Sequence, residues 1–330
     1  MGLNEKFFRS ADEEAGTFFN TVLYTGNNSN KSITGVGFAP DLVWIKNRTN
    51  ANSHNLIDSV RGATKVIFSN ATNAESTRSD SLTSFDSDGF SLGNYVGVNG
   101  NYNYVAWCFK AGGAAVSNTD GDIPSNVSAN VANGFSIVKY TGNGSGSEQT
   151  VGHGLGVKPE MVIIKDLDNV RDWFVYTDII DGSMDVLYLN KTDAKANSSR
   201  TSPTSSVYKI AGTTTLNKSN QNFISYCFHS VAGVSKVGSF VGTGAAGKKI
   251  TLDFEPSWII TKRTSTAGAG WAIIDNKRST ASIKRDYLYA NTNGAEATSG
   301  SGITFNTDGF TFSGASFNTS GDTHIYYAIA

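Results

Sequence analysis

The chain has 330 residues, a formal net charge of −1 and only 17% charged residues. Because nucleic-acid-binding proteins carry a basic stripe, this balance excludes nucleic acid as the main partner. The 35 glycines and 11% aromatic residues, with 39% hydrophobic residues, predict an ordered all-β protein with many tight turns. No apolar run of about 18 residues is present, so we expect no membrane insertion.

The first 20 residues differ from the rest of the chain. Two pairs of phenylalanines flank an acidic centre at residues 12–14. Paired phenylalanines are unfavourable in water unless a surface covers them. Two interpretations remain open: an arm that covers the first domain, or an anchor that docks into a partner. In the second interpretation, the four phenylalanines are the residues that bind the partner: Phe7, Phe8, Phe18 and Phe19.

A first repeat is predicted at residues 21–113. It opens with a strand at 22–24 that enters a Gly/Asn turn, and it closes with an aromatic-rich strand at 104–109. Residues 85–92 predict a hairpin with an Asp-Gly turn, because Asp and Gly accept the positive φ angles of such turns.

A second repeat at 134–232 follows a linker at 114–133 that is rich in Ser, Asn and Ala, and a third repeat spans 233–330. Cys108 and Cys227 take the same place in the first two repeats, and Ala328 takes it in the third. This interchange predicts two small buried thiols rather than a disulfide.

One block occurs once in each repeat, at residues 37–48, 156–166 and 253–263. Each copy has a proline, then one polar or acidic residue, four mostly apolar residues and a cation. Because proline donates no ladder hydrogen bond, it suits the start of a strand. Apolar residues on both faces predict a strand buried between two layers. The spacing of about 100 residues is that of a whole domain.

Short strands at this density predict three tandem β-sandwich domains of jelly-roll or lectin-like type, preceded by the anchor segment at 1–20. The sequence leaves open whether the three domains stand in a row or close into a pseudo-threefold ring.

Several local patterns resemble chemical motifs but lack a part that the chemistry requires. Residues 242–249 nearly match a phosphate-binding loop, but Lys249 replaces the required hydroxyl and a strand is expected next instead of a helix. The four histidines have no metal-ligand spacing and are expected at single surface or turn positions. The Asp-Gly sequences are interpreted as turns, with a bound ion as the alternative. We therefore predict no catalytic, cofactor-binding or metal-binding residue.

Five aromatic residues allow two interpretations: Tyr102, Tyr104, Trp107, Trp173 and Trp271. They could form platforms on which sugars stack, or they could belong to the core. Aromatic residues in strands at these spacings favour the core.

The amino-acid sequences of the repeats resemble those of a known family. The segments that carry the resemblance are the Tyr-Thr-Gly-Asn turns and residues 37–48, 58–63, 84–90 and 104–113. They are similar to a repeated domain of bacteriophage virion proteins, common in marine and cyanobacterial phages and usually labelled tail fibre or structural protein. The resemblance implies a lectin-like or sandwich fold. The third repeat departs most, since it lacks the cysteine and the Tyr-Thr-Gly-Asn wording.

From the residues and the resemblance we expect a non-enzymatic virion structural protein, assembled in the host cytoplasm. It would be a tail fibre or receptor-binding appendage, attached to other virion proteins through residues 1–20 and recognising a host cell-surface glycan or protein. A fibre or knob that decorates the capsid is the alternative, a glycan-degrading virion enzyme is the contrasting class, and a homo-oligomer is left open. Function is expected where the copies disagree, in the loops and in residues 1–20.

Overall fold

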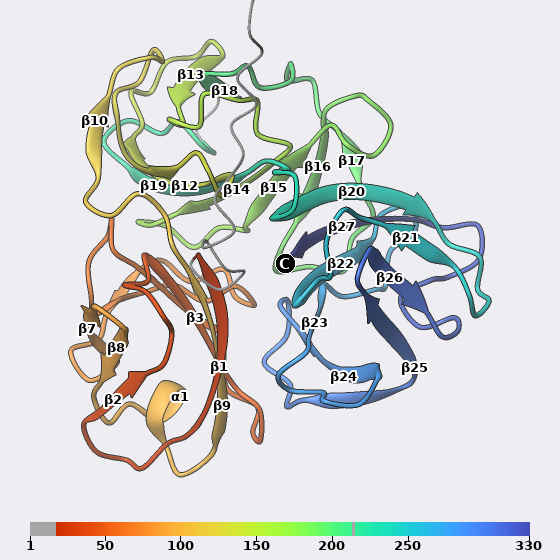
Figure 1. Cartoon of the computed structure of the whole chain (residues 1–330). Helices are drawn as coiled ribbons and strands as arrows, with labels where there is room; N and C mark the ends of the chain where they lie inside the picture. The colour runs from red at the N-terminus through yellow and green to blue at the C-terminus, as the bar shows by residue number, and fades with distance from the viewer. Residues whose placement is uncertain (1–17, 213–214) are drawn as a thin grey trace, which may run out of the picture.

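The computed structural model describes residues 18–212 and 215–330. Nearly all of the regular structure in these ranges is antiparallel β-sheet, which confirms the predicted all-β sandwich class. Figure 1 shows three lobes around a common centre, with the carboxyl terminus near the middle. None of the helices in the described ranges is long and apolar enough to cross a membrane.

The first lobe is a sandwich of two main sheets. Its elements are β1 (Phe19–Thr25), β2 (Lys31–Thr34), β3 (Leu42–Asn47), β4 (Asn55–Asp58), β5 (Lys65–Val66), β6 (Ser76–Thr77), β7 (Leu82–Asp86), β8 (Gly89–Leu92), α1 (Val96–Asn99) and β9 (Asn103–Phe109). The inner sheet has the order β1-β9-β3-β4, and the outer sheet has the order β2-β8-β7. Apolar side chains of both sheets, such as Val43 and Phe90, form the core between them.

The second lobe repeats this plan and extends the inner sheet. Its strands are β10 (Val116–Asn118), β11 (Ser125–Asn130), β12 (Phe135–Thr141), β13 (Gln149–Gly152), β14 (Met161–Asp166), β15 (Phe174–Thr177), β16 (Asp185–Tyr188), β17 (Ala196–Asn197), β18 (Val207–Ile210) and β19 (Asn222–Phe228). The inner sheet has the order β10-β11-β12-β19-β14-β15-β16-β17, and β13 pairs with β18. The segment 114–133, expected as a linker, thus supplies strands β10 and β11, because its alternating Val127 and Ala129 pack into the lobe.

The third lobe is one continuous sheet that folds over itself. Its strands are β20 (Ser235–Val241), β21 (Lys249–Thr251), β22 (Trp258–Arg263), β23 (Ala272–Asp275), β24 (Ile283–Tyr289), β25 (Ala297–Asn306), β26 (Gly309–Phe312) and β27 (Thr323–Ile329). Their order is β20-β27-β22-β23-β24-β25-β26-β21. Residues 242–248 form the turn before β21, so the near match to a phosphate-binding loop precedes a strand, as predicted.

The three proline blocks are structurally equivalent. The same strand order recurs as β1-β9-β3-β4, β12-β19-β14-β15 and β20-β27-β22-β23. The first residues of β3, β14 and β22 pair with Phe109, Phe228 and Ile329 in the same register. Each proline lies two residues before its strand, and each strand is buried along nearly its whole length. The prediction of a strand buried on both faces is confirmed.

A central core explains this double burial. One face of each block packs inside its own lobe, while the other face contributes side chains such as Trp44, Ile163 and Trp258 to a single cluster shared by all three lobes. The three lobes therefore do not stand in a row; they form a ring closed around a shared core (Figure 1). The division into domains at 21–113, 134–232 and 233–330 stays a prediction.

The central core also contains two of the four phenylalanines of the predicted anchor. Phe18 and Phe19 are buried in it, and the Phe19 ring lies 4.8 Å from that of Phe109 and 5.7 Å from that of Trp258, centroid to centroid. Both side chains are thus covered by this chain itself, as the interpretation of an arm over the first domain expects, and their burial gives no support to a partner-binding role. Phe7 and Phe8 lie outside the described residues.

The predictions for the two cysteines, for two Asp-Gly turns and for four of the five aromatic residues are confirmed. Cys108 and Cys227 are free and buried. The Asp-Gly turns join β7 to β8 and β25 to β26, with φ of 150° at Gly89 and 133° at Gly309. Tyr104, Trp107, Trp173 and Trp271 are fully buried core residues, as predicted, whereas Tyr102 is only half-buried.

Candidate functional site

Much of the polar chemistry that the sequence repeats lies inside the molecule. Lys46, Lys165 and Lys262 are the second-to-last residues of strands β3, β14 and β22, and all three are buried. The Nζ of Lys165 donates to the carbonyl of Thr72 in the first lobe at 3.2 Å, and that of Lys262 donates to Thr192 in the second lobe at 3.3 Å. Burial lowers the pKa of each lysine to about 8. The amines of Lys165 and Lys262 thus link neighbouring lobes, whereas that of Lys46 donates to the carbonyls of Asn47 and Asn50 in its own lobe.

Three equivalent backbone hydrogen bonds close the ring. The amide of Glu75 donates to Leu167 at 2.7 Å, and that of Lys195 donates to Thr264 at 2.8 Å. The third bond, from Glu296 to the carbonyl of Arg48 at 2.9 Å, runs from the last lobe back to the first. A bidentate ion pair between the same two side chains, with Nη2 and Oε1 2.7 Å apart, reinforces it.

We call the contact between two neighbouring lobes a seam. Two of the three seams, that between the third and first lobes and that between the first and second, carry a buried ion pair. Asp275 accepts from the Nε of Arg278 at 2.6 Å and from the indole of Trp107, across the seam, at 3.0 Å. The first lobe repeats this with Asp58 and Arg61, and the hydroxyl of Tyr226 donates across the seam at 2.8 Å. In the third seam, Thr177 and Ile180 take the places of Asp and Arg, so that contact is largely apolar.

The histidines are not at the surface, and this corrects the sequence prediction. His54, His153, His229 and His324 are all buried. His54 occupies the position that Trp173 and Trp271 hold in the other lobes, directly before β4, β15 and β23. Its Nδ1 accepts from Trp44 at 2.8 Å, so the proton is on Nε2, which donates to the carbonyl of Tyr289 at 3.1 Å. The two tryptophans donate to the preceding lobe in the same way.

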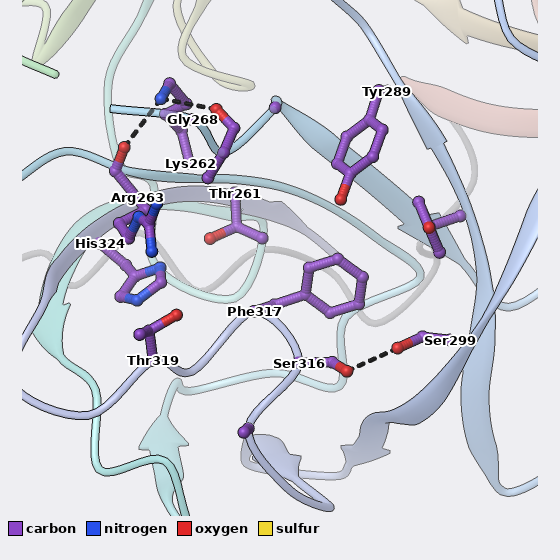
Figure 2. A pocket seen from close by; sticks show the side chains of 14 residues that line it. Thr261, Lys262, Arg263, Gly268, Tyr289, Ser299, Ser316, Phe317, Thr319 and His324 are labelled. Carbon is purple, nitrogen blue, oxygen red and sulfur yellow. Dashed lines mark hydrogen bonds between the residues drawn. The ribbon is translucent and has the colours of Figure 1, made fainter. Parts of the chain in front are cut away.

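An open cleft lies in the third lobe, at strand positions where its residues differ from those of the other two lobes. It has a volume of about 390 Å³ and lies over β22, next to β24 and the loop before β27 (Figure 2). Tyr287, Tyr289 and Phe317 form an aromatic wall, while Thr261 and His324 lie on the strands beneath. Figure 2 shows the Tyr289 hydroxyl directed toward the Phe317 ring.

The aromatic wall is held in a specific shape. The ring centroids of Tyr287 and Phe317 are 5.4 Å apart, and those of Tyr287 and Tyr289 are 4.9 Å apart, both in edge-on arrangements. Phe317 has φ of 60°, which is the left-handed region that bulky residues avoid. Backbone strain of this kind tends to concentrate at functional sites.

The cleft exists because the third lobe differs from the others at equivalent positions. Thr261 stands where β3 and β14 have Ile45 and Ile164, and His324 stands where β9 has Tyr104. In the first lobe, α1 covers this area, and the Tyr104 hydroxyl donates to the carbonyl of Val96 at 2.6 Å. The third lobe has no helix there.

The positive charges around the cleft are already paired. The Nη2 of Arg263 donates to the carbonyl of Ala267 at 2.7 Å, and its Nη1 lies 3.4 Å from Asp322. Lys262 donates to three carbonyls, including that of Ala269 at 2.8 Å. Burial lowers the pKa of His324 to about 4, so its ring is neutral at pH 7. The groups left for a ligand are therefore neutral.

Other candidates are occupied by structural contacts. The carboxylate of Asp88 accepts from the amides of Gly35 at 3.0 Å and Gly37 at 2.6 Å, and these bonds lower its pKa. Within the described ranges, no three His, Cys, Asp or Glu side chains gather as a metal site would need.

The sequence prediction named none of the cleft residues. The available signal was the divergence of the third copy, including the hydroxyl of Thr261 inside the otherwise apolar block. What single-chain reading could not show is that loop 313–319, distant in sequence, meets β22 and β24.

The chain belongs to the family described as a domain of unknown function, DUF7483, whose model matches residues 14–330. The match runs through all three lobes. No curated protein and no solved structure is significantly similar to the chain.

Proposed function

We propose that the chain is a non-enzymatic component of a bacteriophage virion, a tail fibre or receptor-binding appendage. The resemblance of the repeated segments to phage virion proteins supports the placement in a particle. The observation that carries the binding role is the open cleft of the third lobe, where aromatic and neutral polar side chains replace the closed packing of the first lobe.

The division of labour between repeated and unrepeated residues supports this proposal. The ring is stabilised from inside by Lys165 and Lys262, by the three equivalent backbone bonds and by the two Asp-Arg pairs. The surface loops are then free to vary without loss of the fold. A closed body with an open cleft suits recognition outside the cell.

Imaging of intact particles tests the placement. Gold-labelled antibodies against the third lobe are expected to mark the tail. Labelling of the capsid instead would replace the tail assignment by capsid decoration, and absence of the protein from purified particles would contradict a virion role altogether.

A truncation tests attachment. Because Phe18 and Phe19 belong to the central core, the deletion must stop at residue 17. We expect the truncated chain to fold and to be lost from particles; normal incorporation would show that attachment lies elsewhere.

Incubation with host polysaccharide separates binding from catalysis. The proposal predicts saturable binding without a continuing increase in reducing ends. Turnover that is proportional to time and protein concentration would instead identify a glycan-degrading enzyme.

A further inference from the structure

We propose that the third-lobe cleft binds an uncharged hexose residue of a surface polysaccharide, with a face of the sugar ring against Tyr287 and Phe317. This assignment rests on the proposed receptor-binding function and names the ligand class of its site. The cleft volume of about 390 Å³ is in the range of ligand pockets, about 300–1,000 Å³.

The shape of the wall fits a pyranose. A sugar ring has an apolar face of C–H groups and an edge of hydroxyls, so it needs an aromatic surface beside hydrogen-bonding groups. The edge-on rings of Tyr287 and Phe317 give the surface. Thr261, Tyr289 and His324 bring hydroxyl and imidazole groups to the same cleft (Figure 2).

The polar groups have capacity for a ligand. The Oγ1 of Thr261 donates to the carbonyl of Ile325 at 3.0 Å, which leaves its lone pairs to accept. The Nε2 of His324 has no hydrogen-bond partner in the described parts of the chain, although the residue is only 3% exposed. A sugar hydroxyl can both donate and accept, so it matches either group.

The charges favour an uncharged sugar over an acidic one. The guanidinium of Arg263 is paired with Asp322 and backbone carbonyls, and the amine of Lys262 with three carbonyls. An anionic ligand would have to replace these bonds to gain a salt bridge. Neutral hydroxyls need no such rearrangement.

Strain in the loop supports a ligand role. Phe317 keeps φ of 60° although its ring remains half-buried at the edge of the cleft. The equivalent loop of the first lobe forms α1 instead and covers its strand. The third lobe therefore keeps an unfavourable backbone conformation at the place where an aromatic surface is presented.

The test uses the whole chain and defined probes: maltohexaose, mannohexaose and galactohexaose, with hexagalacturonate as the charged counterpart. Isothermal titration is expected to give a Kd of about 1 mM or tighter for at least one uncharged hexamer, and binding of hexagalacturonate about tenfold weaker or more.

Two matched pairs of variants assign that binding to the cleft. Ala315 is exposed at the cleft, so Ala315→Trp should block it and weaken binding at least about tenfold, whereas Ala246→Trp, on an exposed turn of the same lobe, should leave it unchanged. Tyr289→Phe removes one hydroxyl and should weaken binding about two- to tenfold. Tyr188→Phe changes the equivalent residue of the second lobe and should have no effect.

Three results would overturn the assignment: no hexamer saturates the chain, hexagalacturonate binds best, or Ala315→Trp binds like the parent chain. The virion proposal fails separately, because it depends on the presence of the protein in particles. A chain that is found on tails and binds no hexamer would disprove only the ligand class.

Discussion

The seams between the lobes and the cleft of the third lobe use the same strand framework in opposite ways. At a seam, polar groups pair with one another: Asp275 bonds both Arg278 and the indole of Trp107. At the cleft, Thr261 and His324 replace side chains that complete the packing of the first lobe, and in the described residues the Nε2 of His324 is left without a hydrogen-bond partner. The comparison teaches that repeated residues close the ring, while divergent residues open a cleft in one lobe.

The largest effect is expected at a seam. Asp275→Ala leaves the Nε of Arg278 and the indole N–H of Trp107 without an acceptor in a buried site, while the Nη1 of Arg278 keeps its ion pair with Glu296 at 3.0 Å, so the free energy of unfolding should fall by about 3 kcal/mol. Urea unfolding measures this loss. The matched control is Thr177→Ala, which removes a hydroxyl that donates to the Glu160 carbonyl and accepts from the Ile179 amide, and it should lower the free energy of unfolding by only about 1 kcal/mol. Equal losses in both variants would contradict the role given to the ion pair.

Acid should weaken both regions through their histidines. Burial lowers the pKa of His153 and His324 to about 4 and that of His54 well below its usual value of about 6.5. The unfolded chain therefore binds more protons between pH 6.5 and 4, and stability is lost as pH falls through that range.

The expected size is roughly 1–2 kcal/mol each for His153 and His324 between pH 7 and pH 5. Equilibrium unfolding at both pH values measures it, and His153→Gln should reduce the difference. A free energy of unfolding that is the same at pH 7 and pH 5 would contradict the assignment of neutral buried rings.

A smaller effect is expected from a single bond across a seam. Trp271→Phe keeps most of the ring but removes the indole donor to the Tyr188 carbonyl, which lies 2.9 Å away. We expect a loss of about 1 kcal/mol in the free energy of unfolding and no change in oligosaccharide binding. Weaker oligosaccharide binding by this variant would show that the seam and the cleft are coupled.

The smallest effect on stability is expected at the cleft. Ala315→Trp and Ala246→Trp change exposed side chains, so their free energies of unfolding should stay within about 0.5 kcal/mol of the parent chain. Thermal or urea unfolding checks this. A larger loss in Ala315→Trp alone would mean that the loop contributes to folding as well as to binding.

The sequence was informative where a pattern has one physical meaning. A proline before four apolar residues specified the start and the burial of β3, and Asp88 with Gly89 specified the turn after β7. The exchange of Cys108 and Ala328 identified a small buried position. These features depend on local geometry and on comparison among the three copies.

The sequence misled where a side chain meets a different lobe. For Phe18 and Phe19 the sequence left open an arm that covers the first domain and an anchor that docks into a partner, and it gave no sign that both side chains lie in the shared core. His54 could not be placed because only the register shows that it occupies the position of Trp173. The polar composition of 114–133 concealed β10 and β11, since short strands at the edge of a sheet need few apolar residues.

The central claim is that the lobes form one closed body around a shared core and are not three independently folding domains. Thermal unfolding of residues 233–330 alone, followed by circular dichroism, tests it most directly. Without the other lobes, Trp258, Ile260 and Tyr327 would lose their partners in the central core, and each buried apolar side chain is worth about 1.5–3 kcal/mol. We predict no cooperative transition for the fragment. A cooperative transition with full β-sheet content would contradict the claim.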